Sequence, residues 1–272
     1  LVIGSGPAGL EYARVAATLG HDVTVLEQRP EPGGHVLLES MLPKRRVYGQ
    51  MTEWLAAQAV KNGADLRLST TVAPDEVDDL LRAEAPDHVV LATGATWRRD
   101  GFQAFTGNPV PGWETGNCIS WSDALTDTSD GPFLVLDDAA GIIAPLIALH
   151  LRPRGPVKLV TRWPMVGMDT LPSMYFDWII AELYEAGVEL VVDHFIEQID
   201  GDQLELYNVR SAGTKSVVTA DKVVMVTSRA SDHRLKAALK DTGRAYEVIG
   251  DATAPRSAFE AVYEAHRQAR KL

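Results

Sequence analysis

The sequence predicts an α/β protein with parallel sheets, built from two successive series of alternating strands and helices. In the first series, residues 1–95, short runs of Val, Ile and Leu alternate with helical segments, as in parallel strands joined by helices. A second series of the same kind begins at residue 131. The chain has 272 residues and is 46% hydrophobic, which is enough for two modest domains with separate cores.

Each helix of the first series lies between two predicted strands. The strand at residues 1–4 runs into a helix at 7–19, and Gly20 gives that helix a C-terminal stop. After a strand at 21–27, residues 28–46 carry Pro and Gly without a clear period. The remaining elements are a helix at 51–63, a strand at 64–70, a short acidic helix at 74–84, and a strand with a turn at 87–95.

The second series follows a segment that we interpret as a connection between domains, residues 96–131, which is rich in Gly, Pro, Trp and Thr. Strand and helix signals then alternate again. The strands within 204–209 and 216–227 are interpreted as an antiparallel pair joined by a polar turn. The chain ends on an amphipathic helix. The predicted elements are a strand at 131–138, a helix at 141–151, a strand at 157–161, a helix and a strand within 178–195, strands within 204–209 and 216–227, and a strand, turn and helix at 246–272.

The composition excludes several classes of protein. A net charge of −11 argues against a nucleic-acid partner, because phosphate backbones are bound through clustered Lys and Arg. The longest apolar stretch, residues 141–151, is far shorter than the roughly 20 residues that span a bilayer, so we predict no membrane association. The one cysteine, Cys118, excludes an internal disulfide, a thiol redox pair and a cysteine-ligated iron–sulfur cluster within this chain. We therefore expect a cytoplasmic protein without a signal peptide.

The turn between the first strand and the first helix carries the clearest functional motif. Residues 4–9 fit G-x-G-x-x-G, follow a strand and open a helix. Gly4 permits the tight turn, Gly6 lets the backbone approach a pyrophosphate, and Gly9 lets the helix pack on the strand. Glu27 ends the next strand, where a carboxylate can accept hydrogen bonds from ribose hydroxyls, and an acid there indicates an unphosphorylated 2′-hydroxyl. The alternative, a tight turn without a ligand, does not account for the acid.

Two further turns indicate the same site. Thr93-Gly94 follows a buried strand, at a point where backbone can pass close to a ligand. Gly250-Asp251 ends the last strand, and Asp251 can accept hydrogen bonds from sugar or ribityl hydroxyls. The helix that begins near Ser257 can direct its N-terminus at an electron-rich ring or a phosphate. Each would alone be an ordinary turn, but with the first motif they predict one site.

With GSGPAG at 4–9, Gly33-Gly34, ATGA at 92–95 and GDATAPRSA at 250–258 in this order, the sequence resembles the flavoproteins that have two dinucleotide-binding domains. Within that group it is most similar to the C-terminal half of modular old-yellow-enzyme-type oxidoreductases. These include trimethylamine and dimethylamine dehydrogenases, demethylases of N-methylated amino acids, and 2,4-dienoyl-CoA reductase. The resemblance covers nearly the whole chain and is strongest to the amine-dehydrogenase and demethylase branch.

The resemblance implies two Rossmann-like three-layer dinucleotide-binding domains, the second inserted into the first. Residues 1–107 and 231–272 would form a discontinuous domain for FAD, or for ADP alone as in trimethylamine dehydrogenase. Residues 131–230 would be the inserted NAD(P)-binding-like domain, with 108–130 as the connection. No catalytic residue and no metal ligand is predicted. The residues predicted to bind the cofactor are Gly4, Gly6, Pro7, Ala8, Gly9, Glu27, Gln28, Gly34, Thr93, Gly94, Gly250 and Asp251.

The resemblance also implies that the chain is the C-terminal portion of a larger oxidoreductase. In that family a preceding TIM barrel carries FMN and, in many members, a 4Fe-4S cluster, so we expect both groups only outside this chain. The expected partners are that barrel, an electron-transfer flavoprotein as acceptor, and further copies of the parent protein in a homo-oligomer.

The second domain departs from the pattern at its own glycine turn. Asp137, Ala139 and Ile142 take the three glycine positions after its first strand. Side chains there obstruct a pyrophosphate, and the carboxylates of Asp137 and Asp138 repel it. We therefore predict that this domain does not bind NAD(P)H in the usual way, and that Arg162 is structural or solvated rather than a ligand for a 2′-phosphate.

The leading hypothesis is the FAD- or ADP-binding portion of an FMN-dependent amine dehydrogenase or N-demethylase, whose substrate is oxidised in the absent barrel. Two alternatives stay open. One is the corresponding portion of an NAD(P)H-dependent enoyl reductase, similar to 2,4-dienoyl-CoA reductase. The other is a non-catalytic scaffold in which ADP is purely structural.

Overall fold

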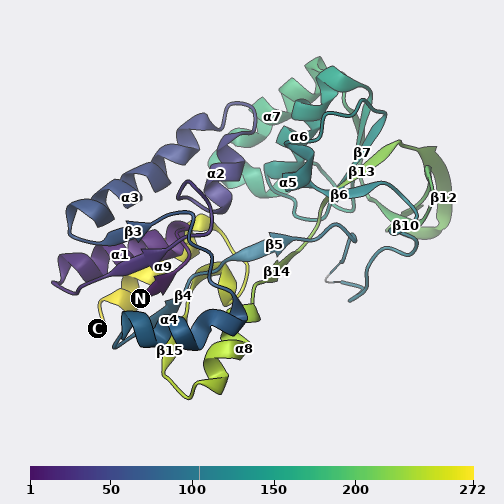
Figure 1. Ribbon diagram of the computed structural model, residues 1–272. Coiled ribbons are helices and arrows are strands. Elements are labelled where there is room, and N and C mark those ends of the chain that lie inside the picture. The colour runs from purple at the N-terminus through teal and green to yellow at the C-terminus, as the bar shows by residue number, and fades with distance from the viewer. Residues whose placement is uncertain (104) are drawn as a thin grey trace. The chain divides into compact units, whose positions relative to one another are not determined.

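The computed structural model describes residues 1–103 and 105–272 and divides the chain into two compact units. Unit 1 comprises Leu1–Thr96 and Ala230–Leu272, and unit 2 comprises Trp97–Arg229 (Figure 1). The chain passes between the units through two short paired strands, β5 (Ala95–Trp97) and β14 (Arg229–Ser231). The predicted fold class, an α/β protein with parallel sheets, is confirmed.

The sheet of unit 1 has five parallel strands in the order β15-β4-β1-β2-β3. Successive side chains of the central strand serve opposite faces, because Val2 belongs to one buried cluster and Ile3 to another. The strands are β1 (Val2–Ile3), β2 (Thr24–Leu26), β3 (Asp65–Arg67), β4 (Val89–Leu91) and β15 (Tyr246–Val248).

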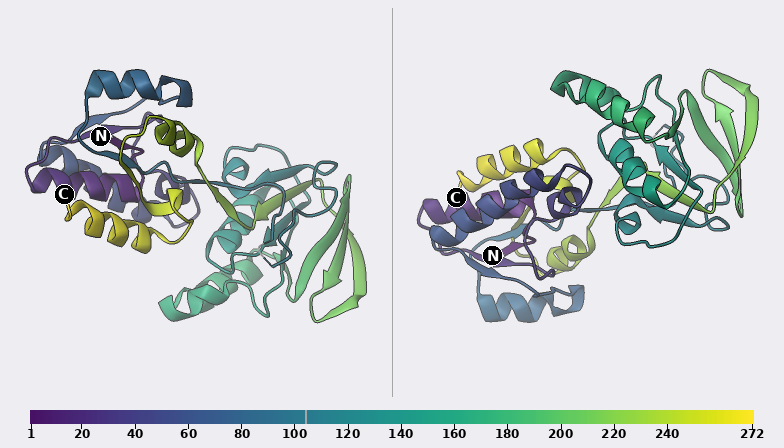
Figure 2. Two further views of the ribbon diagram at one scale, coloured as in Figure 1. Left: turned by 90° about the horizontal axis from the view of Figure 1, so that it is seen from below. Right: turned by 90° about the horizontal axis from the view of Figure 1, so that it is seen from above.

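Helices cover both faces of this sheet and complete three layers (Figure 2). Alanine-rich faces of α1 and α9 pack on each other and on the Val2 side of the sheet, with α3 beside α1. Leucines and valines of α4 and α8 cover the opposite face. The helices of unit 1 are α1 (Pro7–Thr18), α2 (His35–Ser40), α3 (Gln50–Lys61), α4 (Val77–Glu84), α8 (Arg234–Asp241) and α9 (Ala258–Ala269), with 3-10 turns at Arg46–Gly49, Pro74–Glu76 and Gly250–Ala252.

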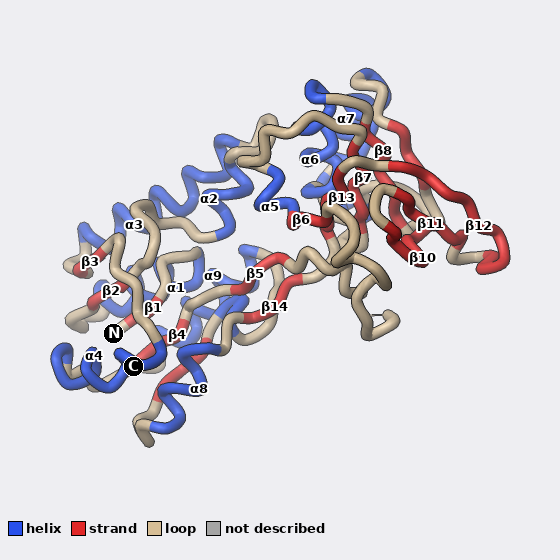
Figure 3. The backbone as a smooth tube through the Cα atoms, turned by 45° about the vertical axis from the view of Figure 1, so that its right-hand side comes forward, coloured by secondary structure: helices blue, strands red, loops and turns tan. Residues whose placement is uncertain are grey.

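The parallel sheet of unit 2 has the order β6-β13-β7-β8-β9, and an antiparallel sheet, β10-β11-β12, shares a buried core with one of its faces (Figure 3). Helix α6 packs on β7 and β8, and α7 packs on α6. The strands are β6 (Cys118–Ser120), β7 (Phe133–Asp137), β8 (Val157–Thr161), β9 (Glu189–Val191), β10 (His194–Asp200), β11 (Gln203–Asn208), β12 (Ser211–Thr219) and β13 (Lys222–Val226). The helices are α5 (Trp121–Ala124), α6 (Ile143–Leu151) and α7 (Tyr175–Glu185), with 3-10 turns at Arg152–Arg154 and Met168–Ser173.

Two parts of unit 2 differ from the elements expected from the sequence. Residues 108–130, expected as a connection, contribute strand β6 and helix α5 to unit 2. The stretch 216–227, interpreted as one arm of an antiparallel pair, contains the end of β12 and then β13, which joins the parallel sheet between β6 and β7. The run KVVMV in β13 is buried throughout, as expected for a strand covered on both faces.

Strand order places a ligand-binding position in each unit. In unit 1 the chain proceeds from β1 to β2 and β3 and then returns to β4 on the other side of β1. In unit 2 it proceeds from β7 to β8 and β9 and then returns to β13 on the other side of β7. Open parallel sheets bind ligands outside the carboxyl ends of their strands where the order reverses. The turns that follow β1 and β7 therefore lie where such a ligand would bind in each unit.

No helix among the described residues is both long enough and apolar enough to cross a membrane.

Candidate nucleotide-binding site

The turn that follows β1 needs glycine for its backbone shape. Gly4 has φ +104°, and its N–H donates to the carbonyl oxygen of Leu26 at 2.8 Å. A Cβ on Gly4 would lie 2.3 Å from the carbonyl oxygen of Ala92, and a Cβ on Gly9 would lie 2.0 Å from that of Gly4. These distances are far below van der Waals contact, so any larger side chain would push the loop, helix α1 and strand β4 apart.

The N-terminus of α1 faces a second glycine turn. Gly6 is the N-cap residue, and no described side chain caps the helix there. A Cβ on Gly34, which has φ +57°, would lie 3.0 Å from the Cα of Gly6. Pro7, which has no N–H, and Ala8 begin α1, and the N–H groups of Gly6, Ala8 and Gly9 have no partner within the helix. The arrangement leaves backbone, rather than side chains, around a position suited to an anion.

Glu27 follows β2 and is tied to the glycine turn. Its side chain is buried, and Oε2 accepts hydrogen bonds from the N–H and the hydroxyl of Ser5, both at 2.8 Å. Oε1 accepts one from the N–H of Arg29 at 2.8 Å. An ionised carboxylate offers about four acceptor positions, so about one remains, on Oε1. Glu27, the residue predicted to bind a ribose, therefore also holds the glycine turn in place. Sequence reasoning did not show this second role.

A pocket lies at the carboxyl edge of the sheet of unit 1, beside the reversal of strand order. Three predicted residues, Gly4, Gln28 and Thr93, line it. The pocket also contains residues that sequence reasoning missed, from the ends of β1 and β2, the stretch after β3, and the beginning of α8 with the residues just before it. They are Ile3, Leu26, Thr70, Val72, Pro74, Asp232, Arg234 and Leu235.

The wall of this pocket nearest α8 is held by polar bonds. The hydroxyl of Thr93 donates to the carbonyl oxygen of Asp232 at 3.1 Å, and the N–H of Asp232 donates to the carbonyl oxygen of Gly94 at 3.0 Å. Arg234 makes a two-pronged ion pair with Asp232, at 2.9 and 2.6 Å, and its hydrogen bonds lower the pKa of that carboxyl. Gly94 has φ +75°, and no described atom lies within 4 Å of its Cβ position. Glycine is therefore favoured there by the backbone conformation and not by crowding from neighbouring atoms.

The last predicted turn lies against the first. Gly250 has φ +63°, and a Cβ there would lie 2.7 Å from the Cβ of Ala8 in α1. The Asp251 carboxylate accepts from the N–H of Arg256 at 2.9 Å. Ser257 and Glu260 form a capping box at the start of α9. This capping box satisfies two of the backbone donors at the helix N-terminus that was expected to face a ring or phosphate.

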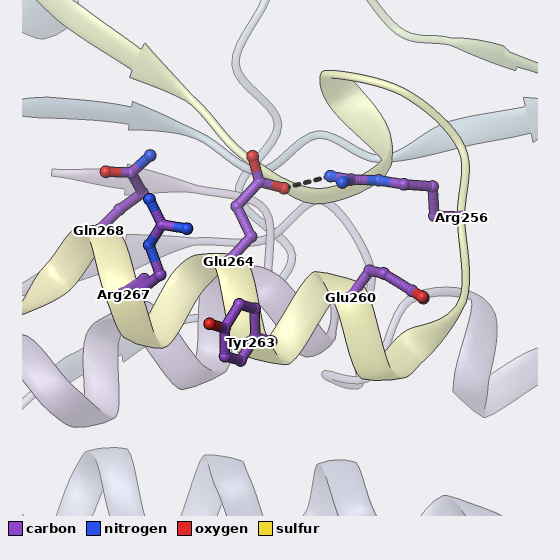
Figure 4. Close-up of a pocket in the computed structure, with 6 residues that line it drawn as sticks. All are labelled: Arg256, Glu260, Tyr263, Glu264, Arg267 and Gln268. Carbon is purple, nitrogen blue, oxygen red and sulfur yellow. Dashed lines mark hydrogen bonds and ion pairs between the residues drawn. The ribbon is translucent and has the colours of Figure 1, made fainter.

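A second pocket lies on the outer face of α9 and contains none of the predicted cofactor residues (Figure 4). It is lined by Arg256, Glu260, Tyr263, Glu264, Arg267 and Gln268. Glu264 pairs with Arg256 and accepts from the N–H of Gly250 at 3.1 Å. This cluster braces the Gly250 turn, and its acidic and basic groups balance one another.

In unit 2 the corresponding turn is closed by a carboxylate of its own. Asp137 at the end of β7 is fully buried, and Oδ1 accepts from the N–H groups of Ala139 at 3.0 Å and Ala140 at 3.1 Å. Burial raises the pKa of Asp137 to about 7, although those two N–H groups and Thr161 act in the opposite direction. The backbone donors that a pyrophosphate would use in such a turn are thus occupied.

The neighbouring acid neutralises the basic residue of the next strand. Asp138 forms an ion pair with Arg162, whose guanidinium lies 4.2 Å from the centre of the Trp163 ring. The indole N–H of Trp163 donates to the carbonyl oxygen of Asp138 at 3.2 Å. Burial raises the pKa of Asp138 despite Arg162. The geometry supports the interpretation of Arg162 as a structural arginine.

Cys118 does not take part in either site. The thiol is buried in unit 2, and burial raises its pKa to about 11. A thiol that stays protonated at neutral pH is a poor nucleophile.

Two parallel α/β units, one inserted into the other and each with a strand–turn–helix at the reversal of its sheet, have the architecture of FAD- and NAD(P)-binding oxidoreductases. The chain belongs to the pyridine nucleotide-disulphide oxidoreductase family, whose model matches residues 1–265.

Its relatives are modular oxidoreductases, which confirms the resemblance drawn from the motifs. The chain is 27% identical to a metal reductase of Desulforamulus reducens and 29% identical to an N,N-dimethylglycine/sarcosine dehydrogenase of Chromohalobacter salexigens, covering 100% and 98% of this chain. Histamine dehydrogenase from Rhizobium sp. 4-9 superposes with a TM-score of 0.92 at 28% identity over 100% of this chain. The chain covers 43% of each of these proteins, and so corresponds to their flavin- and nucleotide-binding portion.

Proposed function

We propose that unit 1 binds the ADP moiety of an adenine nucleotide, FAD or ADP itself, in a flavin-dependent amine dehydrogenase or N-demethylase. The observation that carries this proposal is the glycine turn after β1. It leaves the N-terminus of α1 without a side-chain cap, brings Gly34 against Gly6, and ends beside a buried carboxylate, Glu27. Backbone donors and a ribose acceptor at this spacing match a nucleoside diphosphate.

The residues divide into three roles in this proposal. Gly6, Ala8 and Gly34 admit the pyrophosphate to the start of α1, and Glu27 accepts from a ribose hydroxyl. Thr93, Gly94, Gly250 and Asp251 border the remainder of the cofactor, with Gln28 at the exposed rim. Bound FAD would supply reversible electron transfer, whereas bound ADP would supply only structure.

We further propose that unit 2 does not bind NAD(P)H in the usual way, because Asp137 already accepts from the backbone N–H groups of its turn. Electrons would then leave the parent enzyme for a protein acceptor such as an electron-transfer flavoprotein. FMN and a 4Fe-4S cluster would reside in an N-terminal barrel, where the substrate is oxidised, and the parent would be a homo-oligomer. Hydride transfer from NADH at a catalytic rate would favour the enoyl-reductase alternative instead.

The test replaces Glu27 in the full-length protein. Glu27→Ala should lower the amount of adenine nucleotide that co-purifies with the chain by tenfold or more, because a charge-assisted hydrogen bond contributes roughly 1.5–3 kcal/mol. The thermal midpoint should also fall, since the same carboxylate holds Ser5. Glu31→Ala, which removes an exposed carboxylate nearby, is the control and should retain the nucleotide. Unchanged nucleotide content in Glu27→Ala would contradict the site assignment.

A further inference from the structure

Ser5 is one of the variable positions of the glycine motif, yet it is more completely enclosed than the glycines on either side. Its exposed fraction is 0%. The hydroxyl and the N–H both donate to Glu27 Oε2 at 2.8 Å, and the carbonyl oxygen accepts from the N–H of Gly33 at 2.9 Å. Ser5 therefore joins three segments of the site: the first glycine turn, the end of β2 and the second glycine turn.

These bonds determine which oxygen of Glu27 a ligand can reach. Oε2 has both acceptor positions filled by Ser5, and Oε1 has one filled by Arg29. With one acceptor position left, the carboxylate can take one more donor, and only on Oε1. A glutamate side chain without such bonds would have several rotamers, so the Ser5 hydroxyl also removes motion that a ligand would otherwise have to freeze.

We infer that Ser5 is a positioning residue that presents Oε1 of Glu27 to a single ribose hydroxyl. This inference rests on the proposed function, because it concerns the same nucleotide site. It makes the site selective for a ribonucleoside diphosphate over its deoxy analogue through a residue that does not itself touch the nucleotide.

The experiment measures binding of ADP, 2′-deoxy-ADP and 3′-deoxy-ADP to the full-length protein after its own nucleotide has been removed. The wild-type protein should bind ADP about tenfold more tightly than the analogue that lacks the recognised hydroxyl. Ser5→Ala should weaken ADP binding by about tenfold and leave that analogue almost unchanged, so the preference should disappear. Such a change in ratio is not expected from a general loosening of the loop, which would weaken all three ligands equally.

Two further variants protect the test against misfolding. Ser5→Gly removes the hydroxyl from a loop that already contains glycines and should behave as Ser5→Ala does. Ser5→Thr retains a hydroxyl and should retain the preference for ADP.

The outcomes distinguish an error in the proposed nucleotide site from an error in the proposed role of Ser5. Failure of the wild-type protein to bind ADP at all would overturn the proposed function. Binding of ADP with no preference over either deoxy analogue, or a preference that survives in both Ser5→Ala and Ser5→Gly, would overturn the positioning role and leave the nucleotide site intact.

Discussion

The turn after β1 and the turn after β7 occupy equivalent places in their sheets but leave their helices in different states. In the first, glycines keep side chains away from the start of α1, and the acid that braces the loop, Glu27, follows the neighbouring strand. In the second, the acid is Asp137, which ends β7 and accepts from the backbone N–H groups of the turn that follows. The first turn can receive an anion from outside, whereas the N–H groups of the second are already bonded to the carboxyl group of Asp137.

A turn of this kind can therefore be closed by hydrogen bonds to its N–H groups as well as by bulky side chains. A carboxylate that bonds to the turn's own N–H groups replaces the phosphate and satisfies the donors at the same time. Burial makes the ionised form of this carboxyl group unfavourable in free energy, and the pKa of Asp137 is raised for that reason. In unit 1 the buried carboxylate, Glu27, accepts from one backbone N–H of the turn, that of Ser5, and the start of α1 has no side-chain cap and is left for a ligand.

A side chain added to the turn after β1 should change stability and nucleotide binding more than any other substitution considered below. Gly4→Ala places a Cβ 2.3 Å from the carbonyl oxygen of Ala92, in a backbone with φ +104°. We expect a loss of about 3 kcal/mol or more in the free energy of unfolding, together with loss of the adenine nucleotide. Urea unfolding and nucleotide content of the full-length protein measure both.

Gly20→Ala is the matched control, because Gly20 has φ +94° but no described atom lies within 4 Å of its Cβ position. Backbone strain alone should cost about 1–2 kcal/mol and leave the nucleotide bound. Equal losses in the two variants would show that close approach does not set the requirement for glycine at position 4.

The next effect concerns the closed turn and appears as a dependence on pH. The pKa of Asp137 is raised from about 3.8 to about 7 in the folded state, so between these values the folded chain binds more protons than the unfolded chain. The contribution is favourable at low pH and is lost as the pH rises through 7. Its size is on the order of 4 kcal/mol across that range.

Asp137→Asn should remove this slope, because an amide does not titrate and can still accept from the N–H groups of Ala139 and Ala140. Denaturant unfolding at pH 5 and pH 8 checks the prediction. Asp130→Asn, at an exposed position, should keep the wild-type slope. A slope that persists in Asp137→Asn would contradict the buried charge as its cause.

The smallest effect concerns the packing behind the open turn. Glu11 in α1 is buried. Its carboxylate accepts two hydrogen bonds from the Arg14 guanidinium and one from Nδ1 of His266 in α9, each 2.7 Å long. Glu11→Gln should lower the free energy of unfolding by about 1–2 kcal/mol, since Arg14 loses its charged partner. Glu53→Gln, on the exposed side of α3, should change it by less than about 0.5 kcal/mol. Equal stabilities would show that this network does not brace α1 against α9.

The sequence was most informative where function depends on a local rule. The glycines at 4, 6 and 9 and the acid at 27 are separated by short spacings that the strand–helix–strand unit dictates, so the turn could be predicted. The departure at Asp137 was visible for the same reason. What could not be predicted was that its carboxylate bonds to the turn, because that depends on the fold of the loop.

The residues missed come from distant parts of the chain. Thr70 follows β3 and Arg234 lies in α8, and only the closed sheet brings them to Gly4. Ser5 was visible in the motif, but its partner Glu27 identifies its role only in three dimensions. Strand β13 was misread because it follows β12 directly, although its continuous apolar run is the signal of a buried parallel strand and could have identified it.

We propose that the turn after β1 binds an adenine nucleotide and that the turn after β7 does not. The most direct test is to denature the purified full-length protein and to count the adenine nucleotides released per chain by absorbance and mass. We predict one per chain, FAD or ADP, with no NAD(P)H retained, and none from Gly4→Ala. Two adenine nucleotides per chain, or none from the wild-type protein, would contradict this assignment of the two turns.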